Sequence, residues 1–120
     1  SGFGAGLSYT TYKAGRARVK DGELVLKLRN KGRMDGDEVV QVYMAKREDA
    51  GGPQKALRAF RRVHVPAGPR VTVRIPLDDS VFATYDEASG ELRATPGHFT
   101  LYYGPSADNS VLKKLRIRKK

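Results

Sequence analysis

Apolar and polar residues alternate along most of this chain, and the alternation predicts β-strands separated by turns. The densest apolar run covers residues 36–44, where Val40, Val42 and Met44 share one face of an extended chain. The residues between them include further apolar side chains, so both faces can be partly covered. We therefore predict a central strand for this run.

A second clear run precedes it. Leu24, Leu26 and Leu28 alternate with Val25, Lys27 and Arg29, which predicts a half-buried strand with a basic outer face. Residues 30–36 are rich in Asn, Asp and Gly, which tolerate positive φ, so we expect the chain to reverse there. The two runs should then pair or face each other.

The rest of the chain repeats this pattern of short runs and turns. Residues 47–55 contain Gly and Pro and predict an exposed loop, long enough to cross between two sheets. Further strands are expected at residues 57–65, 71–75, 81–85, around Leu92, 98–103 and 111–117, the last with Leu115 and Ile117 inward. Short strands at close spacing, with no convincing helix, predict an antiparallel β-sandwich.

Composition limits the class of protein. The chain has 120 residues, enough for one domain, and its 39% hydrophobic and 30% charged residues indicate a globular fold. It contains no apolar run long enough to cross a membrane and no signal peptide. The lack of cysteine excludes disulfides and thiolate chemistry. Because it begins Ser1-Gly2, without Met, we expect a segment of a longer protein.

A formal charge of +10 favours an acidic partner, which could be nucleic acid, an acidic polysaccharide or an acidic face of the same parent protein. The candidate face for an anionic ligand consists of Arg58, Arg62, Lys113, Lys114, Arg116 and Arg118. In a regular strand Arg58, Phe60, Arg62 and His64 share one side, where Phe60 could stack on sugar rings or bases. We favour instead a solvated outer face with Phe60 turned inward by a local bulge.

Catalytic groups are not expected in this chain. Acidic clusters at residues 35–38, 78–79 and 86–87 lie at turns, where Asp commonly caps backbone amides. The two histidines lack metal-ligand spacing, and nothing local supports a Ser80, His98 and Asp86 triad. The glycines of residues 2–6 do not match a dinucleotide-binding loop. We therefore expect no catalytic residue, no metal and no cofactor.

Four motifs resemble one family. Residues 3–12 resemble the FGxGLSYTxF segment that enters the fibronectin type III-like C-terminal domain of glycoside hydrolase family three. Residues 30–43 are similar to its N-x-G-x-x-x-G-x-E-V-V-Q-V-Y run, residues 57–63 to its L-x-x-F-x-R-V strand, and residues 96–104 to its PGxFxLxVG ending. The motifs occur in the right order and cover nearly the whole chain.

This resemblance implies an all-β fold, an immunoglobulin or fibronectin type III-like antiparallel β-sandwich of about seven strands. Residues 1–11 would be a connector from a missing upstream catalytic domain, and residues 12–120 would be the fibronectin type III-like domain. The connector would contact the neighbouring domain through Phe3, Leu7, Tyr9 and Tyr12.

The resemblance also implies a function. The catalytic carboxyl groups would lie upstream, in a β-glucosidase or β-xylosidase that hydrolyses β-linked plant-type glycosides and is periplasmic or secreted. The chain itself would be a non-catalytic accessory domain whose partners are those catalytic domains. The alternative is a carbohydrate- or nucleic-acid-binding module that uses its basic face, with acidic polysaccharide a better candidate than nucleic acid. No membrane partner is expected.

Overall fold

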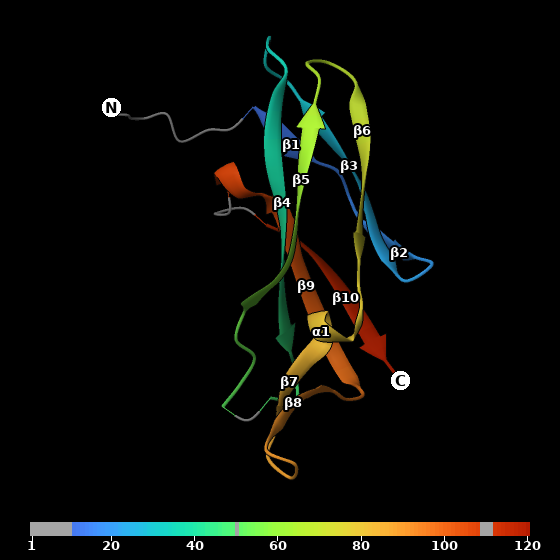
Figure 1. Ribbon diagram of the computed structural model, residues 1–120, viewed down its shortest axis with the longest axis vertical. Helices are drawn as coiled ribbons and strands as arrows, with labels where there is room; N and C mark the ends of the chain where they lie inside the picture. The colour runs from blue at the N-terminus through green and yellow to red at the C-terminus, as the bar shows by residue number, and fades with distance from the viewer. Residues whose placement is uncertain (1–10, 50, 109–111) are drawn as a thin grey trace, which may run out of the picture.

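Two antiparallel sheets pack face to face, and a small hairpin extends from one end of the pair (Figure 1). The computed structural model describes residues 11–49, 51–108 and 112–120. Its elements are β1 (Tyr12–Ala14), β2 (Arg18–Lys20), β3 (Glu23–Asn30), β4 (Gly36–Lys46), β5 (Ala56–Val65), β6 (Arg70–Pro76), α1 (Asp79–Phe82), β7 (Ala83–Asp86), β8 (Glu91–Ala94), β9 (Gly97–Pro105), η1 (Ser106–Asp108) and β10 (Lys113–Lys119).

The first sheet contains β1, β2, β3 and β6. Strand β6 pairs with β3 along one edge, while β1 and β2 pair with two ends of the other edge. Gly15 to Ala17 interrupt what would otherwise be a single strand. Counted this way, the two sheets contain seven strands, and the β7–β8 hairpin is an addition to the expected sandwich.

The second sheet has the order β10-β9-β4-β5, so β4 is central as predicted. Residues 47–55 join β4 to its neighbour β5 in the same sheet. The prediction that this exposed loop crosses between sheets was therefore wrong. The chain crosses from the first sheet to the second earlier, between β3 and β4, and these two strands face each other across the core.

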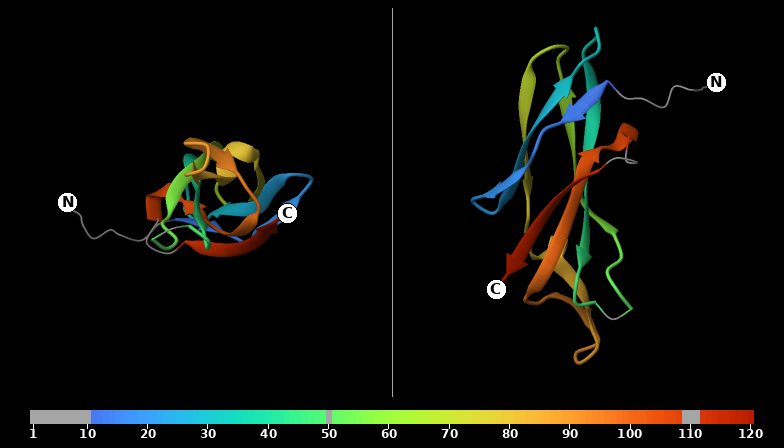
Figure 2. Two further views of the ribbon diagram at one scale, coloured as in Figure 1. Left: turned by 90° about the horizontal axis from the view of Figure 1, so that it is seen from below. Right: turned by 180° about the vertical axis from the view of Figure 1, so that it is seen from behind.

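The core lies between the two sheets (Figure 2). Leu24, Leu26 and Leu28 of β3 are buried in the same cluster as the alternate residues of β4 and β9. This cluster includes Val40, Val42, Met44, Val65, Val73, Ile75, Phe99, Leu101 and Tyr103. The Ala17 N–H donates to the hydroxyl of buried Tyr103 at 2.7 Å, so the interruption between β1 and β2 is satisfied from the opposite sheet.

We expected positive φ angles in the reversal between β3 and β4, but its residues have none. Its centre is the side chain of Asn30, whose Nδ2 donates to the carbonyls of Met34 and Val65 while Oδ1 accepts from the Gly32 N–H. Gly36 is required for a different reason. A Cβ there would lie 2.2 Å from the Tyr12 hydroxyl oxygen.

The predicted strand at residues 81–85 is a one-turn helix, α1, followed by β7. Asp78 caps the helix by accepting from the Ser80 N–H at 3.1 Å. The helix buries Val81 and Phe82, and the Phe82 ring meets the Phe99 ring edge-on at 5.0 Å between centroids. The sequence pattern did not predict this helix. Asp78, Asp79 and Ser80 are typical of a helix start, but a helix of four residues is too short to show a helical period.

Candidate interaction surfaces

The outer face of the second sheet carries exposed apolar side chains on β5. Tyr43 of β4 pairs with Leu57, and Gln41 pairs with Phe60, because Arg58 is an extra residue in β5 at a bulge. Paired residues share a face, so Leu57 and Phe60 both lie on the outer side. They are 46% and 69% exposed, respectively. The expected bulge therefore exists, but the prediction that it turns Phe60 inward was wrong.

One row of this face crosses all four strands. Register places Lys114 beside Tyr102, Tyr102 beside Tyr43, and Tyr43 beside Leu57. The ammonium of Lys55 lies 4.9 Å from the Tyr102 ring centroid, and that of Lys114 lies 5.8 Å from it. The row is thus an aromatic and aliphatic strip flanked by lysines, and tyrosine is one of the residues enriched at protein-docking surfaces.

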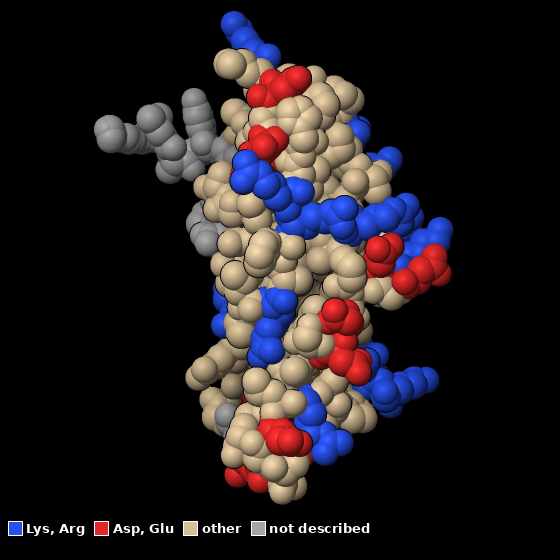
Figure 3. All heavy atoms as spheres, viewed as in Figure 1, with Lys and Arg blue, Asp and Glu red and all other residues tan. Residues whose placement is uncertain are grey.

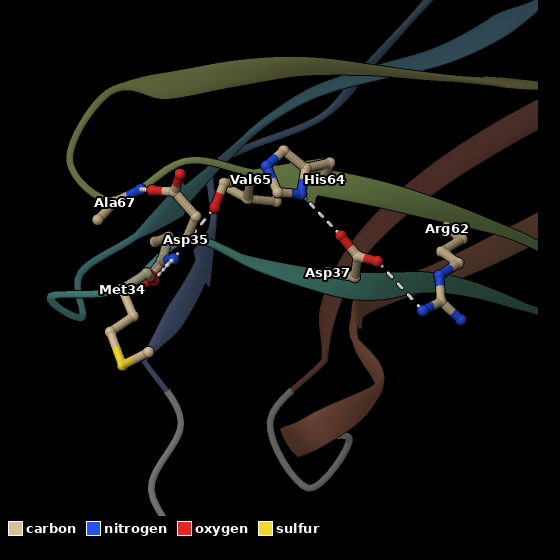
Figure 4. Close-up of polar contacts among 8 residues, drawn as sticks. Met34, Asp35, Asp37, Arg62, His64, Val65 and Ala67 are labelled. Atoms are coloured by element: carbon tan, nitrogen blue, oxygen red, sulfur yellow. Dashed lines mark hydrogen bonds and ion pairs between the residues drawn. The ribbon is translucent and has the colours of Figure 1, made fainter.

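An ion-pair network continues the face toward the far end of β5 (Figure 4). Asp37 lies 2.8 Å from His64 Nδ1 and accepts from Arg62 Nη2 at 3.1 Å. The hydrogen bond with His64, followed by that with Arg62, holds the pKa of Asp37 below its ordinary value. Arg62 therefore has a carboxylate partner within the domain.

The other predicted anion-binding residues do not form one surface with Arg62. Lys114, Arg116 and Arg118 pair with outward residues of β9 and share the outer face, but they lie on β10, at the opposite edge of the sheet from β5. Lys113 pairs with the inward Tyr103, so it lies on the other side. Arg58 turns to the carbonyl of Ser80 on α1.

The predicted contact residues Phe3, Leu7 and Tyr9 lie outside the described residues, as does most of the predicted connector. Tyr12 is half-buried and packs against the core of the domain itself. Its predicted role at an interdomain contact stays a prediction.

The acidic turn residues have structural partners. Asp35 accepts from the Ala67 N–H at 2.9 Å, and buried Glu38 accepts from the Ser106 hydroxyl at 2.8 Å. Asp86 accepts from the Ser89 hydroxyl at 2.9 Å, and this bond is the main cause of its lowered pKa. Together with the Asp78 cap, these contacts make Asp35, Asp78 and Asp86 turn or cap residues, whereas Glu38 lies within β4, so the turn prediction was wrong for it.

Each histidine also has a carboxylate partner within the domain. His98 lies against Glu48, His64 lies against Asp37, and the Ser80 hydroxyl bonds to Asp78. The residues of the triad rejected above are therefore not brought together. Within the described ranges no three His, Cys, Asp or Glu side chains form a group that could hold a metal ion. Over those same ranges no helix is long and apolar enough to span a membrane.

Comparison with known proteins identifies the family. The model of the fibronectin type III-like domain matches residues 38–107. The chain belongs to this family. The match includes the central strand β4 and both of its neighbours, β5 and β9, which confirms the expected fold.

The relatives of this fibronectin type III-like domain are much longer proteins. It is 36% identical to a xylan 1,4-β-xylosidase of Xylanibacter ruminicola over 96% of the chain and 14% of that protein. It is 31% identical to thermostable β-glucosidase B of Acetivibrio thermocellus over 93% of the chain and 16% of that protein. The domain thus spans about one seventh of the length of such relatives, and the resemblance drawn from its motifs is confirmed.

A solved structure gives the same result. The crystal structure of a β-glucosidase from Streptomyces venezuelae, in complex with D-glucose, contains a segment that superposes on this domain with a TM-score of 0.72. The two are 30% identical, and the match covers 97% of this domain and 16% of that chain.

A second surface of the fibronectin type III-like domain extends the basic outer face that was predicted for the strand at residues 24–28. The outer face of the first sheet contains two hollows lined largely by Arg and Lys from β1, β2, β3, β6 and the residues beside them. The sequence shows alternate basic residues in β3 and in β6 separately. That they form one basic surface follows only from the pairing of the strands, which places Lys27 beside Thr72 and Arg29 beside Arg70.

Proposed function

We propose that this fibronectin type III-like domain is the non-catalytic accessory domain of a β-glucosidase or β-xylosidase that hydrolyses β-linked plant-type glycosides. It stabilises the catalytic domains by packing against them. The proposal is supported by relatives whose names describe β-xylosidase and β-glucosidase activity and which are about seven times longer than this chain.

The observation that carries the docking role is the exposure of Leu57 and Phe60 in a well-formed sheet. A solvated sheet face normally carries polar side chains, whereas here Leu57 lies beside Tyr43, whose other neighbour is Tyr102, and Phe60 lies beside Gln41 on the same face. Complete burial of an exposed side chain of this size contributes about 1.5–3 kcal/mol. Docking would give Phe60 most of this free energy and Leu57, which is 46% exposed, roughly half of it. A surface of this kind stabilises a neighbour without taking part in its chemistry.

A paired substitution in the full-length enzyme tests this role. Leu57→Ser with Phe60→Ser should lower the temperature at which the enzyme loses activity, while kcat/KM well below that temperature stays unchanged. The matched control is Val19→Ser with Met34→Ser, which removes two apolar side chains that are also exposed but lie away from this face, one in β2 and one between β3 and β4.

The isolated domain provides the second control. Both pairs of substitutions are on exposed positions, so neither should change its own thermal midpoint by more than a surface substitution does. Equal inactivation temperatures for the two paired variants of the full-length enzyme would contradict docking through Leu57 and Phe60. The gene sequence before Ser1 gives an independent check, because we expect it to encode a domain with a catalytic carboxylate.

A further inference from the structure

The outer face of the first sheet is basic along most of its length. In β3, Lys27 and Arg29 point away from the core, and their partners in β6 are Thr72 and Arg70. One further pair along, Val25 lies between Arg18 of β2 and Arg74 of β6. Val25 is only 6% exposed on this outer face, so the aliphatic stems of the neighbouring arginines cover it.

Two hollows lie next to each other on this face. The first has a volume of about 350 Å³ and the second about 340 Å³, and they share Gly15, Lys27 and Arg70. Gly15 lies in the interruption between β1 and β2, where the absence of a side chain leaves room above Lys27. The basic residues that line the pair are Lys13, Arg16, Arg18, Lys27, Arg29, Lys31, Arg70 and Arg74.

The residues that line these two hollows include no Asp or Glu. Glu23 approaches from one end, where it lies 3.9 Å from Arg74, a long contact between partly exposed groups. Arg29 donates through Nε to the carbonyl of Gly68 at 3.1 Å, which fixes the direction of its guanidinium group. In Figure 3, basic side chains gather along the edge of the molecule where Figure 1 places β6 and β2. Eight cations at this density repel one another unless an anion lies between them.

The chemistry of the lining favours an anionic ligand. Five of the eight cations are arginines, whose planar forks bind carboxylates and phosphates in two parallel hydrogen bonds. Of these two groups, carboxylates fit the proposed function, because glucuronate-bearing xylan carries them. The row of Arg18 and Arg74 lies four residues along β3 from the row of Arg70, roughly 13 Å, so an extended ligand can reach both hollows.

We propose that this basic face binds a polysaccharide that carries carboxylate groups, one or more in each hollow. The choice of a plant-type polysaccharide rests on the proposed function of the domain. The two surfaces are compatible, because the apolar strip lies on the outer face of the second sheet and the hollows lie on the outer face of the first. The domain can therefore dock on its enzyme and hold an acidic chain at the same time.

The test measures the binding of glucuronate-bearing xylan to the 120-residue chain. Calorimetric titration is carried out at low and at physiological salt. Lys27→Gln with Arg70→Gln alters both hollows and should weaken binding by about tenfold or more. The matched control is Arg116→Gln with Arg118→Gln, which removes the same charge from the second sheet. It should weaken binding by about twofold or less, and the melting curves of both variants should show that they fold.

Two further titrations identify the ligand. The same xylan with its carboxyl groups reduced should not bind, because the arginines then lose their anionic partners. Equal losses in the two paired variants would overturn the proposal by showing that net charge alone governs binding. Tighter binding of duplex DNA, weakened by Lys27→Gln with Arg70→Gln, would also overturn it and assign the face to nucleic acid. If the unaltered domain binds no xylan while Leu57→Ser with Phe60→Ser destabilises the full-length enzyme, this inference fails and the docking function stands.

Discussion

Glu48 accepts two hydrogen bonds from His98, a residue fifty positions further along the chain. The His98 backbone N–H donates to Oε1 at 2.9 Å, and Nδ1 of the ring lies 2.6 Å from Oε2. Gly97 makes this approach possible, since a Cβ there would lie 2.6 Å from Glu48 Oε1. The contact ties the loop after β4 to the beginning of β9.

Stability should depend on pH through this contact. The backbone hydrogen bond, and then the bond from the ring, lower the pKa of Glu48 from 4.5 to about 2. A lowered carboxyl pKa stabilises the fold above about pH 4.5, and this stabilisation is lost as the pH falls through about 2. In Glu48→Gln, the thermal midpoint should fall below that of the unaltered domain at pH 7, and the two should converge toward pH 2.

Thermal melts between pH 7 and pH 2 measure this effect. The control is Asp49→Asn, which removes a carboxylate from the same loop without touching the contact with His98. A constant difference between Glu48→Gln and the unaltered domain over the whole range would show that the contact does not depend on the charge of Glu48.

Gly36→Ala should destabilise the domain by about 1–3 kcal/mol, because the new methyl group overlaps the Tyr12 hydroxyl. Urea unfolding of Gly36→Ala, Tyr12→Phe and the double variant measures the coupling. The double variant should be less destabilised than the sum of the single changes, because it lacks the oxygen that clashes. Gly15→Ala is the control, since its nearest neighbour would be at an ordinary 3.5 Å. Strict additivity would contradict the clash.

Val42→Asp should prevent folding. Val42 is fully buried at the centre of β4, and an uncompensated buried charge there costs about 3–5 kcal/mol or more, against a total stability of roughly 5–15 kcal/mol. The adjacent Gln41→Asp, on the outer face, should leave a cooperative transition. Circular dichroism during heating distinguishes the two, and an unchanged melting curve for Val42→Asp would mean that its inward placement is wrong.

The isolated domain should not release the aryl group from aryl β-glucosides or β-xylosides. Retaining hydrolysis needs two carboxyl groups roughly 5–5.5 Å apart that are available to the sugar. In this domain Asp35, Glu38 and Asp86 are tied to turn and backbone groups instead. A chromogenic assay checks this. Turnover that disappears on substitution of an Asp or Glu would contradict the expectation.

Strand alternation predicted the sheets well because burial on one face imposes a period of two. It put Leu24, Leu26 and Leu28 on one side of β3 and Val40, Val42 and Met44 on one side of β4, and both sets are buried. It failed where a single residue changes the period. A bulge near Phe60 was expected, but the position of the extra residue, Arg58, decides which side Phe60 takes and has no signal in the pattern. The one-turn helix after Asp78 is too short to produce a helical period.

Surfaces were harder to predict than the core. A basic face depends on which strands are neighbours, and the pairing of Arg29 with Arg70 cannot be obtained from either strand alone. Gly36 and Gly97 are part of the sequence motifs, but the steric reason why glycine is needed at each position appears only in the structure. Each leaves room for a side chain distant in sequence, Tyr12 in one case and Glu48 in the other.

The bulge in β5 shifts the alternation of inward and outward side chains by one residue. Without it, Leu57 and Phe60, three positions apart, would point to opposite sides of the strand. Deleting Arg58 would leave the two residues only two positions apart, so both would stay on the outer side of a regular strand. A change that straightened β5 at its full length would instead turn one of them inward and dismantle the apolar strip, so the strip depends on the conformation of the strand as much as on its composition.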